Sequence, residues 1–133
     1  MSDIQNVMDM LKEHDVQFVD LRFTDPRGKW QHTAQHVSTI NDDFFTDGIM
    51  FDGSSIAGWK AINESDMILK PDLNRGIMDP YTSHNTLVLF CDILDAVKKN
   101  PYERDPRGIA KKAEAYLKTT GVGDKAYFGP EPE

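Results

Sequence analysis

The chain has little of what marks a membrane, secreted or thiol-dependent protein. Its single cysteine, Cys91, excludes a disulfide within the chain and lies in an apolar run, where a thiol is more typical of a small buried side chain than of a nucleophile. That run, residues 87–91, is the longest apolar stretch and falls far below the roughly 20 residues that span a bilayer. Residues 1–10 lack the basic start and apolar stretch of a signal peptide. We therefore expect a cytoplasmic protein.

Positive charge and phosphate-binding motifs are also scarce. Fifteen lysines and arginines against 22 aspartates and glutamates give a net charge of -7, which disfavours binding to nucleic acid or to anionic membranes. The sequence has no Walker-type or Gly-x-Gly-x-x-Gly phosphate loop and no Gly-x-Ser-x-Gly elbow, so a self-contained nucleotide or hydrolase site finds no support. The length of 133 residues suits one domain, or one small domain and part of a second.

Hydrophobic periodicity, caps and turn residues predict a mixed α and β chain. The helices are expected from the start of the chain to near residue 14, over 41–46 with Asn41 as cap, and from Asp105 as cap to just before Gly121. The strands are expected over 16–23 and 29–37, joined by a turn at 25–28, then over 67–73, 86–93 and from residue 125 onward.

Three features predict how these elements are organised. Residues 86–93 are so continuously apolar that we place them as a central strand covered on both faces. Pro71 argues that strand 67–73 lies at a sheet edge or ends irregularly. Asn-Pro and Asp-Pro pairs within residues 100–106 predict a boundary between a domain of residues 1–103 and the beginning of another at 104–133. The last strand has no partner, so the chain end looks cut.

The segment MFDGSSIAGW, residues 50–59, has the composition of a site rather than of a core. Two glycines allow sharp backbone turns, so Asp52, Ser55 and Trp59 can be presented on a shaped protrusion. The plain alternative for Asp52 is a turn former whose carboxylate bonds the local backbone. Trp59 suits either internal packing or contact with a partner surface. Asp66 adds acid downstream, which on its own is typical of a solvated surface.

Two acids at the end of the chain have metal-ligand spacing. Glu131 and Glu133 are two residues apart, so on an extended segment both point to one face and can share one divalent cation or serve two neighbouring ones. The plain alternative is a solvated tail. His32 and His36 have the spacing of a helical metal site, but on a strand they lie about 13 Å apart, too far for one zinc ion.

Three motifs in register resemble a known enzyme family. The runs FDGSSIAGW at 51–59, NESDMILKPD at 63–72 and FGPEPE at 128–133 closely resemble bacterial glutamine synthetase of type I. The similarity covers essentially the whole chain, which looks like the first quarter to third of such an enzyme. The resemblance implies an α+β fold: a β-grasp domain over residues 1–103, followed by the truncated start of the catalytic domain.

The resemblance also implies an activity and roles for individual residues. The full-length enzyme would ligate ammonia to L-glutamate with ATP, through γ-glutamyl phosphate, whereas this piece alone would be inactive. Asp52 and Ser55 would belong to the ammonium pocket, with Asp52 holding the cation and accepting its proton. Glu131 and Glu133 would ligate Mg²⁺ or Mn²⁺. Trp59 and Asp66 would lie at a subunit contact near the pocket, in a ring-shaped assembly that is a dodecamer when complete.

Two other functions stay open at this point. A β-grasp module can serve as a non-catalytic interaction domain, because a fold does not fix a function. A relative that ligates glutamate to an amine instead of ammonia is the other alternative, and the presence of Asp52 and Ser55 argues against it.

Overall fold

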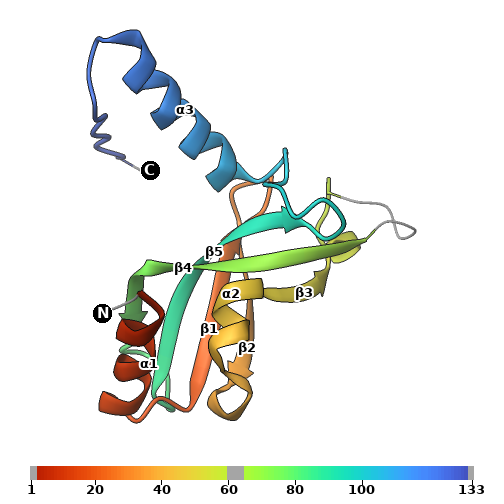
Figure 1. The fold of residues 1–133 in the computed structure, drawn as a ribbon, viewed down its shortest axis with the longest axis vertical. Helices are drawn as coiled ribbons and strands as arrows, with labels where there is room; N and C mark the ends of the chain where they lie inside the picture. Colours follow the sequence, from red (N-terminus) through yellow and green to blue (C-terminus); the bar gives the residue numbers. More distant parts are fainter. Residues whose placement is uncertain (1–2, 60–64, 132–133) are drawn as a thin grey trace.

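The computed structural model describes residues 3–59 and 65–131, which form one mixed sheet with helices (Figure 1). The sheet has five strands in the order β2-β1-β5-β4-β3; its central pair, β1 and β5, is parallel and the other neighbours are antiparallel. The elements are α1 (Asp3–Glu13), β1 (Phe18–Thr24), β2 (Trp30–His36), η1 (Val37–Thr39), α2 (Asp42–Asp47), β3 (Ile49–Asp52), η2 (Gly53–Ser55), β4 (Asp66–Met78), β5 (Thr86–Asp95) and α3 (Pro106–Thr120). The predicted α+β class is confirmed.

The hydrophobic core lies between one face of the sheet and two helices, α1 and α2. Alternate residues of each strand point to this face, because successive side chains of a strand point to opposite sides. Burying one such apolar side chain contributes roughly 1.5–3 kcal/mol. The core includes Val7 and Leu11 of α1, Phe44 and Phe45 of α2, Val19, Leu21 and Phe23 of β1, Met67 and Leu69 of β4, and Leu87, Leu89, Cys91 and Ile93 of β5.

The short helix α2 is fixed at both ends by signals that the sequence carries. Asn41 accepts a hydrogen bond from the Phe44 N–H at 2.9 Å, as expected of its cap position. Gly48 ends the helix at a φ of 78°, and a Cβ there would overlap the carbonyl oxygen of Leu69. The ammonium group of Lys70 donates to the Phe45 carbonyl, so one of the last carbonyls of α2 has a partner on β4.

The central strand was predicted correctly in position and only partly in burial. In β5, Leu89 and Cys91 are fully covered, and burial raises the pKa of the Cys91 thiol, which is a structural side chain as predicted. On the opposite face Phe90 and Asp92 are only half-buried, because α1 and α2 both lie on the other side. The expectation of full cover on both faces is therefore wrong for this half of the strand.

Pro71 does not lie on an edge strand, since β4 pairs with both β5 and β3. The other alternative, an irregular strand, is confirmed. Pairing with β3 extends only to Leu69, so Pro71 is opposite a neighbour on one side alone, namely Cys91. The register then shifts between Pro71 and Gly76. Proline has no N–H to donate, and at position 71 no residue of β3 is opposite it to accept such a hydrogen bond.

Helix α3 projects away from the sheet (Figure 1). Its caps are as predicted: Asp105 accepts a hydrogen bond from the Arg107 N–H at 3.0 Å, and Gly121 follows the last turn with a φ of 70°. No residue of α3 is buried, and Tyr116 is 71% exposed. Residues 125–131 form no strand, because none of the described strands lies beside them to exchange hydrogen bonds, so that prediction is wrong.

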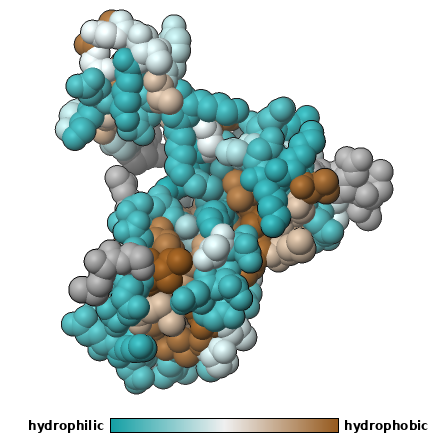
Figure 2. Space-filling view, in the orientation of Figure 1, coloured by the Kyte–Doolittle hydropathy of each residue, from teal (hydrophilic) through white to brown (hydrophobic). Residues whose placement is uncertain are grey.

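Figure 2 shows that hydrophilic residues cover most of the face seen in Figure 1. Among the described residues, no helix has the length and apolar character needed to cross a bilayer.

Candidate functional site

The loop that carries Asp52 leaves the sheet at the end of β3 and is held against β4. The N–H of Gly53 donates to the Ser65 carbonyl at 2.8 Å, which continues the ladder between the two strands by one residue. Gly53 is buried, and a Cβ at this position would overlap the sulfur of Met67. Glycine is therefore required here by close packing, and the start of the loop has a fixed geometry.

Asp52 caps the one-turn helix η2 and remains exposed to solvent. Its Oδ1 accepts the Ser54 N–H at 2.8 Å and the Ser54 hydroxyl at 2.7 Å. The Ser54 hydroxyl, then its N–H, lower the pKa of Asp52, aided by the Ser65 hydroxyl and opposed by partial burial. Asp52 is therefore a fixed, ionised carboxylate at neutral pH. The turn-former interpretation is confirmed by these contacts, and they leave the carboxylate accessible.

A second carboxylate lies directly opposite the first. Asp66 begins β4 and is the cross-strand partner of Asp52, and both side chains are exposed. Side chains opposite each other on neighbouring antiparallel strands have Cβ atoms about 5 Å apart. Ser55 is exposed at the end of η2 on the same loop. The arrangement can attract a small cation, with two negative charges and a hydroxyl within a short stretch of surface.

Trp59 directly follows Gly58 in the loop and is buried in this chain, with 7% of its surface exposed. Its ring stacks on Phe23 at 5.7 Å between centroids and meets Phe51 and Tyr102 edge-on at 6.1 and 5.7 Å. Its indole N–H is buried and has no acceptor among the described residues. Of the two roles that the sequence left open, packing is observed, and a contact with another subunit stays a prediction.

The predicted metal ligands are only partly described. Glu131 is exposed on a segment without regular structure, and Glu133 lies outside the described residues. Within residues 3–59 and 65–131, no three potential ligands of the His, Cys, Asp and Glu types gather to hold a metal ion. A carboxylate oxygen is the donor that Mg²⁺ and Mn²⁺ prefer, but the described set is incomplete as a metal site.

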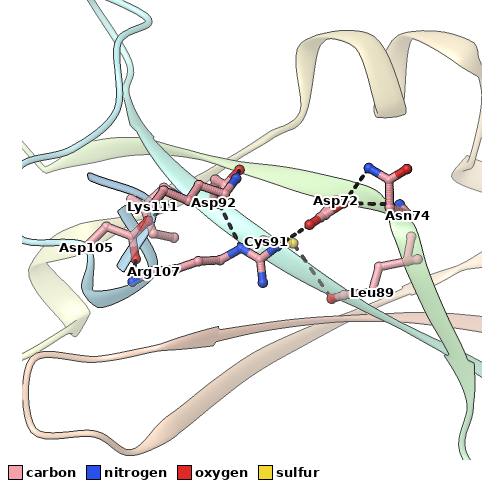
Figure 3. A network of polar contacts seen from close by, with 9 residues as sticks. Asp72, Asn74, Leu89, Cys91, Asp92, Asp105, Arg107 and Lys111 are labelled. Atoms are coloured by element: carbon pink, nitrogen blue, oxygen red, sulfur yellow. Dashed lines mark hydrogen bonds and ion pairs between the residues drawn. The ribbon is translucent and has the colours of Figure 1, made fainter. Parts of the chain in front are cut away.

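Sequence reasoning missed the polar network that ties α3 to the sheet (Figure 3). Arg107 donates to Asp92 at 2.8 Å and also to Asp72, and Lys111 pairs with Asp92. Burial alone would raise the pKa of Asp72, but the Asn74 N–H and the charge of Arg107 hold it below its usual value. The sequence gives no signal for this network, because its members come from β4, β5 and α3.

The bond of Asp52 to the backbone of Ser54 is the turn-former contact that the sequence offered, whereas the Ser54 hydroxyl and Ser65 were missed as its partners. An aspartate commonly accepts a hydrogen bond from the N–H two residues on, which is the Asp52–Ser54 spacing. Ser65 becomes a neighbour of Asp52 only through the pairing of β3 with β4.

Known proteins resemble this chain in sequence and in fold. The family model described as "Glutamine synthetase, beta-Grasp domain" matches residues 15–96. The glutamine synthetase of Azospirillum brasilense is 64% identical over 133 residues, which is 100% of this chain and 28% of that protein. The glutamine synthetase of Escherichia coli strain K12 is 54% identical over 129 residues, or 97% of this chain and 28% of that protein. The chain thus spans little more than a quarter of the curated relatives it matches.

Solved structures with the same fold include a cryoEM structure of Plasmodium falciparum glutamine synthetase. It has a TM-score of 0.83 and 26% sequence identity, and the match covers 94% of this chain and 24% of that one. A structure described as "Apo GmaS without ligand" has a TM-score of 0.74 and 21% identity over 84% of this chain and 25% of that one, which shows a shared fold alone.

Proposed function

Because this chain belongs to the glutamine synthetase family through its β-grasp domain, we propose that it is the amino-terminal part of an enzyme that ligates ammonia to L-glutamate with ATP. Residues 1–103 would form the β-grasp domain, and residues 104–133 would begin the catalytic domain. The 133-residue chain by itself would be inactive, because most of the glutamate and ATP contacts would lie in the remaining polypeptide.

The observation that carries this proposal is the fixed, exposed and ionised carboxylate of Asp52 on a loop beside Asp66 and Ser55. Such a carboxylate is suited to hold ammonium, a small cation with four N–H donors. Transfer of one proton from ammonium to Asp52 leaves ammonia with a free electron pair. The nitrogen then forms a bond to the γ-carbonyl carbon of γ-glutamyl phosphate, the carbon–oxygen bond to phosphate breaks, and the departing phosphate takes the second proton that the nitrogen loses to become an amide.

The proposal also assigns a metal and an assembly. Glu131 and Glu133 would supply part of the ligands for Mg²⁺ or Mn²⁺, which when bound neutralises phosphate charge, and the other ligands would come from outside the described residues. Asp52, Ser55, Asp66 and Trp59 would face or support a site completed by a neighbouring subunit of a ring, a dodecamer in the complete protein. ATP, glutamate and ammonium would be its substrates, and the cytoplasm its location.

The test compares two nucleophiles in the complete enzyme. Hydroxylamine is largely uncharged at neutral pH, so it needs neither a cation site nor deprotonation. In Asp52→Asn we expect ammonia-dependent turnover to fall by about 100-fold or more, the usual contribution of a general base. Hydroxylamine-dependent formation of γ-glutamyl hydroxamate should fall much less, and ATP binding should be unchanged. The matched control is Asp124→Asn, which removes the same charge from an exposed position on the segment after α3.

Equal losses with both nucleophiles would refute the role of Asp52. A complete wild-type protein without hydroxamate formation would favour the non-catalytic interaction module instead. Preference for an alkylamine over ammonia would identify the glutamate–amine ligase.

A further inference from the structure

The Gly58–Trp59 part of the loop that carries Asp52 is contacted by the segment that joins β5 to α3. Arg104 donates a hydrogen bond from Nη1 to the carbonyl oxygen of Gly58 at 2.8 Å, although the two residues are 46 positions apart. The ring of Tyr102 meets Trp59 edge-on, with 5.7 Å between ring centroids. Two consecutive loop residues, Gly58 and Trp59, are thus contacted by side chains only two positions apart in the other segment.

That segment is itself firmly attached to the sheet. The N–H of Tyr102 donates to the carbonyl of Ile93 at 2.9 Å, so the backbone beside Tyr102 is bonded to β5. The buried carboxylate of Asp105 accepts a hydrogen bond from the N–H of Ile93 at 3.2 Å. The backbone N–H of Asp105 donates to the Tyr102 carbonyl, also at 3.2 Å. Arg104 therefore extends from a support fixed on both sides, and its guanidinium is restrained relative to β5 and the core.

The Gly58–Trp59 part of the loop has little backbone restraint of its own. The Gly53–Ser65 hydrogen bond ties the two residues that flank the loop next to β3 and β4, whereas Gly58 has a φ of 88°, a conformation that costs glycine little and that glycine can leave as easily. Within residues 53–59, the N–H of Ile56 donates to the Gly53 carbonyl and the N–H of Trp59 donates to the Ile56 carbonyl. The Arg104 bond therefore limits the backbone freedom at Gly58.

We propose that Arg104 and Tyr102 are positioning residues that hold Gly58 and Trp59 in place and so fix where Ser55 is presented beside Asp52. The inference rests on the proposed function of Asp52 for its kinetic consequence. It stands independently for its structural consequence, the restraint of loop residues 53–59. Neither side chain is assigned a contact with a reacting atom.

The position of Arg104 separates this role from a purely structural one. Arg104 is exposed, so removal of its guanidinium leaves no buried group without a partner and should change the melting temperature little. The same removal frees the Gly58 carbonyl and widens the range of loop orientations. The expected effect is a weaker capture of ammonium without an equal loss in the later chemical step.

The first experiment measures loop opening in the complete protein by amide hydrogen exchange. Arg104→Ala should raise the exchange rate in residues 53–59 by about fivefold, because loss of roughly one hydrogen bond raises the population of the open loop by about that factor. Arg104→Lys, which keeps a charged donor, should restore at least part of the protection. The matched control is Lys12→Ala, an exposed cation on α1. Unchanged exchange in residues 53–59 of Arg104→Ala would overturn the inference whatever the function of the protein.

The second experiment is kinetic and uses the same variants. In Arg104→Ala the KM for ammonium should rise about fivefold, while the KM values for glutamate and hydroxylamine stay within twofold of wild type. Tyr102→Ala, which removes the ring contact with Trp59, should resemble Arg104→Ala. A uniform change in all three KM values would overturn the positioning role. If Asp52→Asn fails to separate ammonia from hydroxylamine while the exchange result holds, the proposed function fails and the loop restraint stands.

Discussion

Asp52, the last residue of β3, pairs directly with Asp66, the first residue of β4, and both carboxylates reach solvent on the same side of the sheet. Like charges directly opposite each other on neighbouring strands destabilise a sheet. At Asp52 the hydrogen bonds from Ser54 outweigh this effect, since the pKa of Asp52 is lowered rather than raised. A bound cation would relieve the repulsion, which is a reason for this pair to serve binding rather than stability.

Asp66→Asn should therefore raise the melting temperature slightly at low ionic strength, because the variant loses the repulsion with Asp52. The gain should disappear in about 1 M salt, where the screening length is about 3 Å. In the complete enzyme the same change should raise the KM for ammonium. Thermal melts at two salt concentrations, with Asp124→Asn as the control, measure the first effect. A lower melting temperature at low salt would contradict the account.

Gly53→Ala should destabilise the fold by about 1–3 kcal/mol, the usual cost of overpacking, because the added methyl overlaps the sulfur of Met67. Gly123→Ala is the matched control, since a Cβ at Gly123 has no neighbour within 4 Å. Urea unfolding compares the two free energies. The close packing at Gly53 would be refuted if both variants were equally stable.

Asp105→Ala should cost about 2 kcal/mol at neutral pH, because the N–H groups of Ile93 and Arg107 lose their acceptor. Burial raises the pKa of Asp105, and the hydrogen bonds from the Ile93 and Arg107 N–H groups lower it only in part. A folded-state pKa above the unfolded value gives stability that is present at low pH and lost as the pH rises through the folded pKa. Asp105→Asn should remove this loss. Urea unfolding from about pH 4, near the ordinary pKa of aspartate, to neutrality would reveal it, and an unchanged slope would contradict the assignment.

Arg107→Ala should destabilise the fold by about 1.5 kcal/mol at neutral pH, since Asp72 and Asp92 lose a shared charged donor. The pKa of Asp72 is held low in the folded protein, so its contribution is present above the ordinary aspartate pKa and lost as the pH falls. The gap between wild type and variant should therefore shrink in acid. Lys118→Ala, which removes an exposed pairing with Glu114, should cost at most about 0.5 kcal/mol. Equal losses for the two variants would argue against the network.

The parts of this fold that depend on neighbouring residues could be predicted from the sequence. Asn41, Asp105 and Gly121 act through hydrogen bonds or backbone angles within their own turn, so their residue types are sufficient signals. The alternation of apolar residues likewise located β1, β2 and β5 to within two residues at each end, whereas β3 was not predicted and β4 continues beyond the predicted end at residue 73. The exposed position of Asp52 followed from the glycines that flank its loop.

The parts that depend on distant pairing could not be predicted. A proline is accommodated at position 71 of an inner strand because β3 is too short to pair with it, which depends on the length of another segment. Ser65 approaches Asp52, and Arg104 approaches Gly58, only after the sheet has formed. The expected strand after residue 125 failed for the same reason, because a strand is defined by a neighbour that the local sequence does not contain.

The parallel pairing of β1 with β5 joins Phe18 to Thr86 at the middle of the sheet. During synthesis, β1 leaves the ribosome long before its central neighbour exists, and only the hairpin with β2 can form early. Contacts this distant in sequence slow folding and expose unpaired strand edges meanwhile. The nascent chain would therefore reach a stable sheet only after β5 has emerged, and a translational pause just before that point would prolong its aggregation-prone stage.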